Sequence, residues 1–253
     1  ELIMYLNEPT LSDIVKKQFH FKLNANAASF STFVLLQIGA IIMALIGNSH
    51  SFYYSSDDSV VSIITLSNDM SVGLAMAWAF FLGIMLTTRI KQSESFSFVT
   101  TRLSNHLSNF LFMLFASLIA GVSVTLAGSA IKLLGFFIHG EMVVHSSSLV
   151  ESPSNFVLQI LTAIAYVLLF FLIGYSISSF VQLSKLFIAL FVLIWILLST
   201  INGNWDGTEY AMTLIQFFGY ERSVLLFILK IFGTVLSLFA ISTFITNRLE
   251  VRN

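Results

Sequence analysis

The chain has 253 residues, of which 57% are hydrophobic and only 10% are charged, and it contains 26 Phe, 2 Pro and no Cys. A soluble domain carries about 25% charged residues, so this composition excludes a water-soluble enzyme, and its apolar, aromatic character excludes a disordered chain. A net charge of −1 leaves no basic surface for nucleic acid, and the lack of Cys excludes a disulfide scaffold. A membrane protein with several spans remains.

The first patterned segment is 11–22, which precedes any long apolar run. Its apolar residues repeat at the spacing of one helical face, namely Leu11, Ile14, Val15 and Phe19. Its polar residues fall largely elsewhere, namely Asp13, Lys16, Lys17 and His20. We expect an amphipathic helix in the inner membrane interface that leads into the first span. A generic interfacial anchor without a further role is the alternative.

Six apolar runs are candidates for spans, since a helix needs about 20 mostly apolar residues to cross a bilayer. They lie near 28–47, 70–88, 109–137, 155–181, 186–201 and 223–246. The fifth run is the shortest, and the third and fourth are long enough to tilt or protrude. None alternates as a membrane β-strand would. The predicted fold class is all-α, with residues 1–253 forming one transmembrane domain of six helices.

Basic residues alternate between successive loops, which predicts the orientation. The segments on the N-terminal side of the membrane hold Lys16, Lys17, Lys22, Arg89, Lys91, Arg102, Lys185, Arg248 and Arg252. The opposite loops carry Asp and Glu, with Arg222 as their one base. Short cytoplasmic loops are enriched in Lys and Arg. Both termini are therefore predicted to be cytoplasmic, with an even number of spans.

The loop 93–107, between the second and third spans, carries a second amphipathic pattern. Its apolar face comprises Phe96, Val99, Leu103 and Leu107, and its polar side comprises Glu94, Arg102, Asn105 and His106. Exposed Phe96 and Phe98 would be unfavourable in water. The predicted cytoplasmic helix therefore lies either on lipid headgroups or in the groove of a partner protein.

Four polar residues within the spans are candidates for a translocation path: Gln37, Gln159, Lys132 and Lys230. Ionisable groups at membrane depth are functional candidates by default. The two lysines belong to the outer halves of their spans, where they form a positive patch on the route or snorkel toward Glu141 or Glu221. The two glutamines line the route or hold neighbouring helices together.

Two further apolar patterns concern packing and the outer surface. Gly121, Gly128 and Gly135 recur every seventh residue in the third span, which predicts a seam for close helix packing. The segment 209–220 is apolar but too short to cross the membrane. It is expected to be an interfacial or re-entrant piece on the outer face.

The motifs of common catalytic sites are missing from the sequence. The five His form no His-Glu-x-x-His pair, and neither a Gly-x-Ser-x-Gly elbow nor a phosphate-binding P-loop occurs. We therefore predict no catalytic residue, no metal site and no cofactor site in this chain, and no enzyme activity of its own.

This layout resembles the permease subunits of type 2 ABC exporters, the ABC-2 family, in the compact bacterial form encoded separately from its ATPase. The resemblance rests on layout and covers nearly the whole chain. The segment Phe96-Ser-Phe-Val-Thr-Thr-Arg-Leu, within 93–107, resembles the coupling helix of that family, which docks on the ATPase. Residues 11–22 resemble its connecting helix, and 209–220 resemble its outer re-entrant segment.

The resemblance implies a partner set and a mechanism. Two permeases, identical or sister chains, would pair in a bacterial plasma membrane with two copies of a cytoplasmic ABC ATPase, which would hold the ATP and Mg. The coupling interface would comprise Glu94, Phe96, Phe98, Val99, Arg102 and Leu103. The cargo would be amphipathic or lipid-like, for example an antimicrobial peptide, and would leave the cell. A membrane scaffold or sensor that transports nothing, and an ATP-independent secondary transporter, are the alternatives.

Overall fold

The computed structural model describes residues 10–47, 49–56, 59–88, 102–139, 153–183, 216–219 and 223–248, and the single positions 186, 187, 189, 193, 213 and 221. Five of its helices are long and apolar enough to cross a membrane. They are α2 (Ala27–Gly47), α3 (Asp69–Thr87), α5 (Arg102–His139), α6 (Pro153–Leu183) and α9 (Val224–Arg248). The described chain is thus a multi-pass helical membrane protein, and five of the six predicted spans coincide with these helices. The remaining one, 186–201, lies outside the described residues except for four helical positions.

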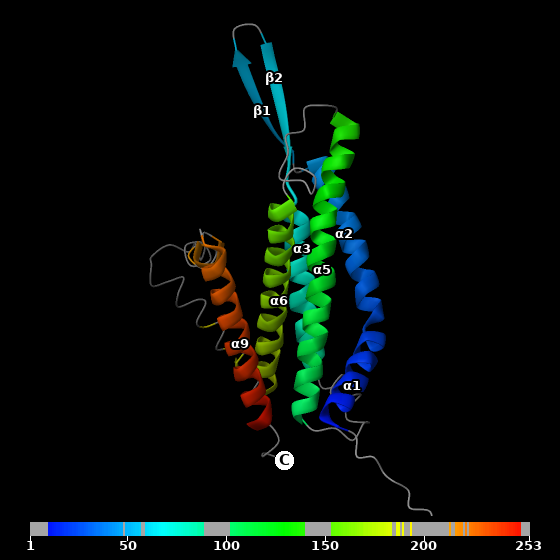
Figure 1. Ribbon diagram of the computed structural model, residues 1–253, viewed down its shortest axis with the longest axis vertical. Helices are drawn as coiled ribbons and strands as arrows, with labels where there is room; N and C mark the ends of the chain where they lie inside the picture. Colours follow the sequence, from blue (N-terminus) through cyan, green and yellow to red (C-terminus); the bar gives the residue numbers. More distant parts are fainter. Residues whose placement is uncertain are drawn as a thin grey trace, which may run out of the picture.

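Side-chain contacts fix the relative directions of α6 and α9. Tyr166 packs edge-on against Phe227, and Ser242 donates a hydrogen bond to Ser176, so residue numbers rise together along the two helices. The helices are therefore parallel, and residues 184–223 connect opposite ends of the bundle (Figure 1). The first described helix lies at the lower end of Figure 1, where α9 also ends.

A β-hairpin joins α2 to α3 and is an exception to the all-α prediction. Strand β1 (Ser49–Ser56) pairs antiparallel with β2 (Ser59–Leu66), from Ser49 opposite Leu66 to Ser56 opposite Ser59. The hairpin projects beyond the upper end of the bundle in Figure 1. Its sequence carries a strand signal, because β-branched and aromatic residues flank an Asp-Asp pair. Strands of eight residues are much shorter than the runs of about 20 apolar residues that indicate membrane-spanning helices.

Helix α1 (Leu11–Ala25) confirms a helix over 11–22 but with a different buried face. Thr10 caps its first turn by accepting a hydrogen bond from the Asp13 N–H. Val15 is buried as predicted, whereas Leu11 is exposed and Lys22 is buried. The helix packs beside the first turns of α5 (Figure 1). The described α1 is therefore part of the bundle, and its inward face is partly polar.

The first turns of α5 contain the end of segment 93–107. Residues 102–107 continue into α5 without a break. Leu103 is 58% exposed and Leu107 is also exposed, while His106 is buried and Asn105 is half-buried. The apolar residues thus face outward and the polar ones inward, because α1 and α6 supply the polar partners for the inward face.

Glycines bring α3 and α6 into backbone contact. A Cβ atom on Gly174 would lie 2.1 Å from the Phe80 carbonyl oxygen, and one on Gly83 would lie 2.2 Å from the Phe171 carbonyl oxygen. In the predicted seam of α5, a Cβ on Gly121 would lie 2.4 Å from an Ile164 side-chain carbon. Small residues are the usual means of close helix approach in membranes. The seam is confirmed at Gly121, where it faces α6.

Candidate functional site

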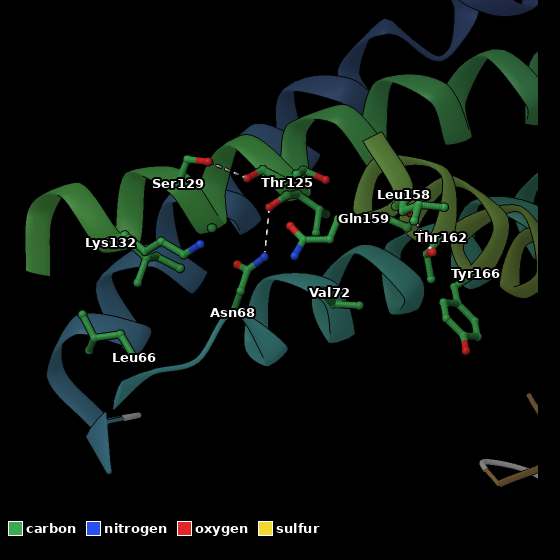
Figure 2. A pocket seen from close by; sticks show the side chains of 14 residues that line it. Leu66, Asn68, Val72, Thr125, Ser129, Lys132, Leu158, Gln159, Thr162 and Tyr166 are labelled. Atoms are coloured by element: carbon green, nitrogen blue, oxygen red, sulfur yellow. Dashed lines mark hydrogen bonds between the residues drawn. The ribbon is translucent and has the colours of Figure 1, made fainter. Parts of the chain in front are cut away.

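A cavity of about 400 Å³ lies between α5, α6 and the beginning of α3, and Leu66 at the end of β2 borders it. Its lining includes Lys132 of α5 and Gln159 of α6, two of the four predicted path residues (Figure 2). The cavity lies at the end of the bundle near the hairpin, away from α1. The structure therefore brings together two candidates that are 27 positions apart in the sequence.

Asn68 contributes the most unusual polar group of the cavity. It stands at the N-cap position of α3, yet its side chain makes no capping hydrogen bond. Its Nδ2 instead donates to the Val124 carbonyl of α5 over 3.0 Å. Its Oδ1 is buried and has no hydrogen-bond partner among the described residues. Such an acceptor costs about 1–3 kcal/mol, which a donor from a ligand or water would recover.

The hydroxyl groups of the cavity are acceptors toward its interior. Thr125 donates to the Gly121 carbonyl at 2.9 Å, and Ser129 donates to the Thr125 carbonyl at 3.3 Å (Figure 2). Thr162 donates to the Leu158 carbonyl at 2.7 Å. Each hydroxyl proton is used within its own helix, so the hydroxyl oxygen is left to accept. The lining thus combines one cation with several neutral acceptors.

Gln37 does not line this cavity. Its Nε2 donates to the Ser71 carbonyl at 3.3 Å, and its Oε1 accepts from the Ser71 hydroxyl. Both partners are buried, and the pair joins α2 to α3. Of the two interpretations given for Gln37, the structure favours the contact between helices.

Lys230 also lies apart from the cavity. It forms an ion pair with Glu221, and its Nζ lies 4.2 Å from the centre of the Phe217 ring and 3.3 Å from the Phe217 carbonyl oxygen. This is the geometry expected of a lysine that snorkels toward Glu221. The segment 209–220 is described only at Thr213 and over 216–219, which form a helical turn.

Lys230→Met is expected to fold and insert like the natural protein. The ion pair with Glu221 is partly exposed, and such pairs contribute about 1 kcal/mol or less. Thermal unfolding in detergent measures this effect. A loss above about 2 kcal/mol, or a transport defect with normal assembly, would contradict the assignment of Lys230 as a snorkelling residue.

A second polar cluster surrounds Lys22, which the distribution of basic residues places among the cytoplasmic lysines. Lys22 is 8% exposed. Its Nζ donates to Asn109 Oδ1 at 2.5 Å, Ser108 Oγ at 2.6 Å and Asn105 Oδ1 at 2.7 Å, and it lies 3.2 Å from the Asn105 carbonyl oxygen. All four acceptors are neutral. Burial lowers the pKa of Lys22 to about 7, from an ordinary value of 10.5.

The Lys22 cluster extends from α1 across α5 to α6. Asn109 donates to the Tyr175 hydroxyl at 3.3 Å, and His106 Nδ1 lies 2.8 Å from the same hydroxyl. Gln18, one turn before Lys22 in α1, is buried, and neither of its amide atoms has a hydrogen-bond partner among the described residues. The sequence does carry a signal for this cluster, because Gln18 and Lys22 are spaced i, i+4 on one helix face. A count of basic residues in each loop does not separate the faces of a helix.

The remaining predicted site residues are only partly described. Glu94, Phe96, Phe98 and Val99 of the predicted coupling interface lie outside the described residues. Arg102 is the first residue of α5, and Leu103 follows on its outward face. In the part of the chain that the structure describes, no three His, Asp or Glu side chains are grouped so that they could hold a metal ion.

Comparisons with protein-family models, with curated proteins and with solved structures give no match to this chain.

Proposed function

We propose that the chain is the permease subunit of an ATP-driven exporter, and that a separate cytoplasmic ABC ATPase drives it to move an amphipathic or lipid-like cargo outward. The observation that carries this proposal is the continuity of α5. This one helix of 38 residues holds the end of the predicted coupling segment at its start and the cavity wall at Val124–Lys132. At 1.5 Å per residue it is about 57 Å long, against about 30 Å of hydrocarbon. A rigid helix of this kind can transmit motion from one membrane surface to the other.

The directions of the helices support an even number of spans. Because α6 and α9 are parallel, a sixth span over 186–201 would connect the end of α6 to the beginning of α9. Lys16 and Arg248 lie at the end of the bundle where α1 begins and α9 ends (Figure 1). A cytoplasmic assignment of that end agrees with the distribution of Lys and Arg. The predicted coupling segment then faces the cytoplasm, and the cavity lies toward the outside.

One observation favours an ATP-independent secondary transporter as the second candidate. Lys22 has a pKa of about 7 within a buried cluster that joins three helices, so protons could be coupled to a change in packing. Transport by vesicles that contain this chain alone, driven by a pH gradient without ATP, would support that alternative. A scaffold or sensor subunit would show neither ATP-driven nor pH-driven transport.

The double substitution Phe96→Asp with Leu103→Asp is expected to abolish ATPase co-purification while the protein still inserts. Leu103 is exposed on the outward face of α5 where the predicted coupling segment ends. Charges on the face of a docking helix remove its apolar contact with the partner groove. The measurement is recovery of the ATPase with the tagged chain from native membranes.

Leu133→Asp is the matched control. Leu133 is 60% exposed, close to the exposure of Leu103, but lies near the other end of α5. This variant should retain the ATPase. Undiminished co-purification with the double variant would disprove the coupling assignment, and no ATPase even with the natural chain would favour the scaffold.

A further inference from the structure

The ammonium group of Lys22 lies among neutral oxygens that all belong to α5. They are Asn109 Oδ1, Ser108 Oγ, Asn105 Oδ1 and the Asn105 carbonyl oxygen, at 2.5, 2.6, 2.7 and 3.2 Å from Nζ. We call these four atoms the α5 oxygen cage. A lysine as buried as Lys22 is normally paired with a carboxylate. Among the residues that the structure describes, no Asp or Glu forms an ion pair with Lys22.

The number and the chemistry of the cage oxygens suit a metal ion better than an ammonium group. An ammonium group has three N–H donors, whereas four oxygens converge on Lys22 Nζ. An alkali-metal ion has no directional donors, and neutral oxygens such as backbone carbonyls bind it in proteins. Sites for calcium and magnesium normally include carboxylates. The cage therefore has the composition of a site for a monovalent cation, and Lys22 takes the place of the ion.

Contacts that do not involve Lys22 hold the cage oxygens in place. The Ser108 hydroxyl donates to the Asn105 carbonyl at 2.9 Å, so its own oxygen is left to accept. Asn109 Nδ2 donates to the Tyr175 hydroxyl at 3.3 Å, which directs the opposite amide atom, Oδ1, to the cage. Tyr175 is buried in the core of the bundle. The cage is therefore organised before a cation enters it.

The position of Lys22 couples the occupant of the cage to the docking of a helix. Lys22 lies in the last turn of α1, which packs beside the first turns of α5 (Figure 1). Phe19 makes a second contact between these helices, edge-on against Phe115. The Lys22 ammonium is tethered to α1, so an ion that takes its place in the cage removes the polar contacts that hold α1 on α5.

We infer that the α5 oxygen cage is a binding site for an alkali-metal cation, potassium or sodium, and that the ammonium group of Lys22 competes with this ion. In the docked state α1 fills the site with its own cation, and binding of a free ion releases α1. The site is distinct from the cavity between α3, α5 and α6, and its residues lie near the beginning of α5. The inference does not depend on an ATPase, so its failure leaves the exporter proposal standing.

The test is the ion dependence of Lys22→Ala, which removes the ammonium group and most of its stem and leaves the cage free. Thermal unfolding of the full chain in detergent is measured at fixed pH in potassium, sodium or N-methylglucamine chloride of equal ionic strength. Potassium or sodium should raise the unfolding temperature of Lys22→Ala by about 3 °C or more over N-methylglucamine, and the rise should saturate. The natural chain should show no such rise, because Lys22 already fills the cage.

Two variants serve as controls. Lys16→Ala removes an equal charge from the exposed side of α1 and should respond to the ions like the natural chain. Ser108→Ala, added to Lys22→Ala, removes one cage oxygen and should raise the half-saturating salt concentration about tenfold. The inference is overturned by a lack of any ion-specific rise in Lys22→Ala, by an equal rise in Lys16→Ala or in calcium chloride, or by a response that Ser108→Ala leaves unchanged.

The natural chain gives a second readout, which holds even if Lys22→Ala does not fold. Replacing N-methylglucamine by potassium or sodium at equal ionic strength should lower the protection of α1 amides from hydrogen exchange. The decrease should be about twofold when the ion concentration equals its apparent dissociation constant. Equal protection of α1 in all three salts would show that no free ion competes with Lys22, and would overturn the inference.

Discussion

Gly174→Ala is expected to destabilise the helical bundle by about 3 kcal/mol or more. The new Cβ would lie 2.1 Å from the Phe80 carbonyl oxygen and 3.0 Å from its carbonyl carbon, so a backbone would have to move. Separation of α3 from α6 would also loosen the aromatic core, in which Trp78 packs against Phe171. Unfolding by heat or SDS in detergent, followed by circular dichroism, measures the loss.

Gly73→Ala is the matched control within α3. Among the residues that the structure describes, none has an atom within 4 Å of a Cβ at this position, and the same is true of Gly233 in α9. Alanine favours a helix by up to about 1 kcal/mol over glycine, so both controls should be neutral or slightly stabilising. Equal stability of Gly174→Ala and Gly73→Ala would show that α3 and α6 are not in backbone contact.

Lys22→Met is expected to loosen the docking of α1 on α5 by about 2 kcal/mol or more, because it leaves buried oxygens of Asn105, Ser108 and Asn109 without their donor. Cysteine cross-linking between α1 and α5, or protection of α1 amides from hydrogen exchange, measures the change. Lys16→Met is the control, since Lys16 is exposed on the same helix. Tight docking of α1 in Lys22→Met would contradict the role of the cluster.

The same cluster predicts a pH dependence with a definite sign. The pKa of Lys22 is about 7 when α1 is docked and about 10.5 when the side chain is in water. Between these values the undocked state binds more protons, so raising the pH favours the docked state. Docking should therefore strengthen from pH 7 to 10.5 and remain weakest below 7, with His106 and Tyr175 as the other titratable groups of the cluster. Lys22→Met should lack this slope, and an identical slope in both proteins would assign it to other groups.

The spans were predictable because each depends on local composition. Exclusion from water acts on every apolar run separately, so α2, α3, α6 and α9 begin and end within about two residues of the predicted ranges, whereas α5 begins seven residues earlier than predicted. The hairpin was not predicted, because strands of eight residues are too short to be recognised as membrane spans. The backbone contact of α3 with α6 was not predicted either, since Gly83 and Gly174 are 91 positions apart and no local sequence pattern connects them.

The candidate site was predictable only in part, for a similar reason. Lys132 and Gln159 stand out because polar groups are rare in apolar runs, and the structure places both on one cavity. Asn68 lies in the connection between β2 and α3, where an asparagine is common. Its significance comes from the buried Oδ1, whose lack of a partner among the described residues is seen only in the structure. Lys22 was assigned to a charged segment, because its burial depends on residues 105–109 of a distant helix.

The parallel arrangement of α6 and α9 has a consequence for biosynthesis. The part of the chain up to Leu183 contains α2, α3, α5 and α6, which alternate in direction and return to the end of the bundle where α1 lies (Figure 1). This part can be threaded into the bilayer and folded while the ribosome is still making the remainder. Because α6 and α9 run in the same direction, their C-terminal ends lie at the same end of the bundle, so a reporter enzyme fused after Leu183 and one fused after Arg248 would be active in the same compartment.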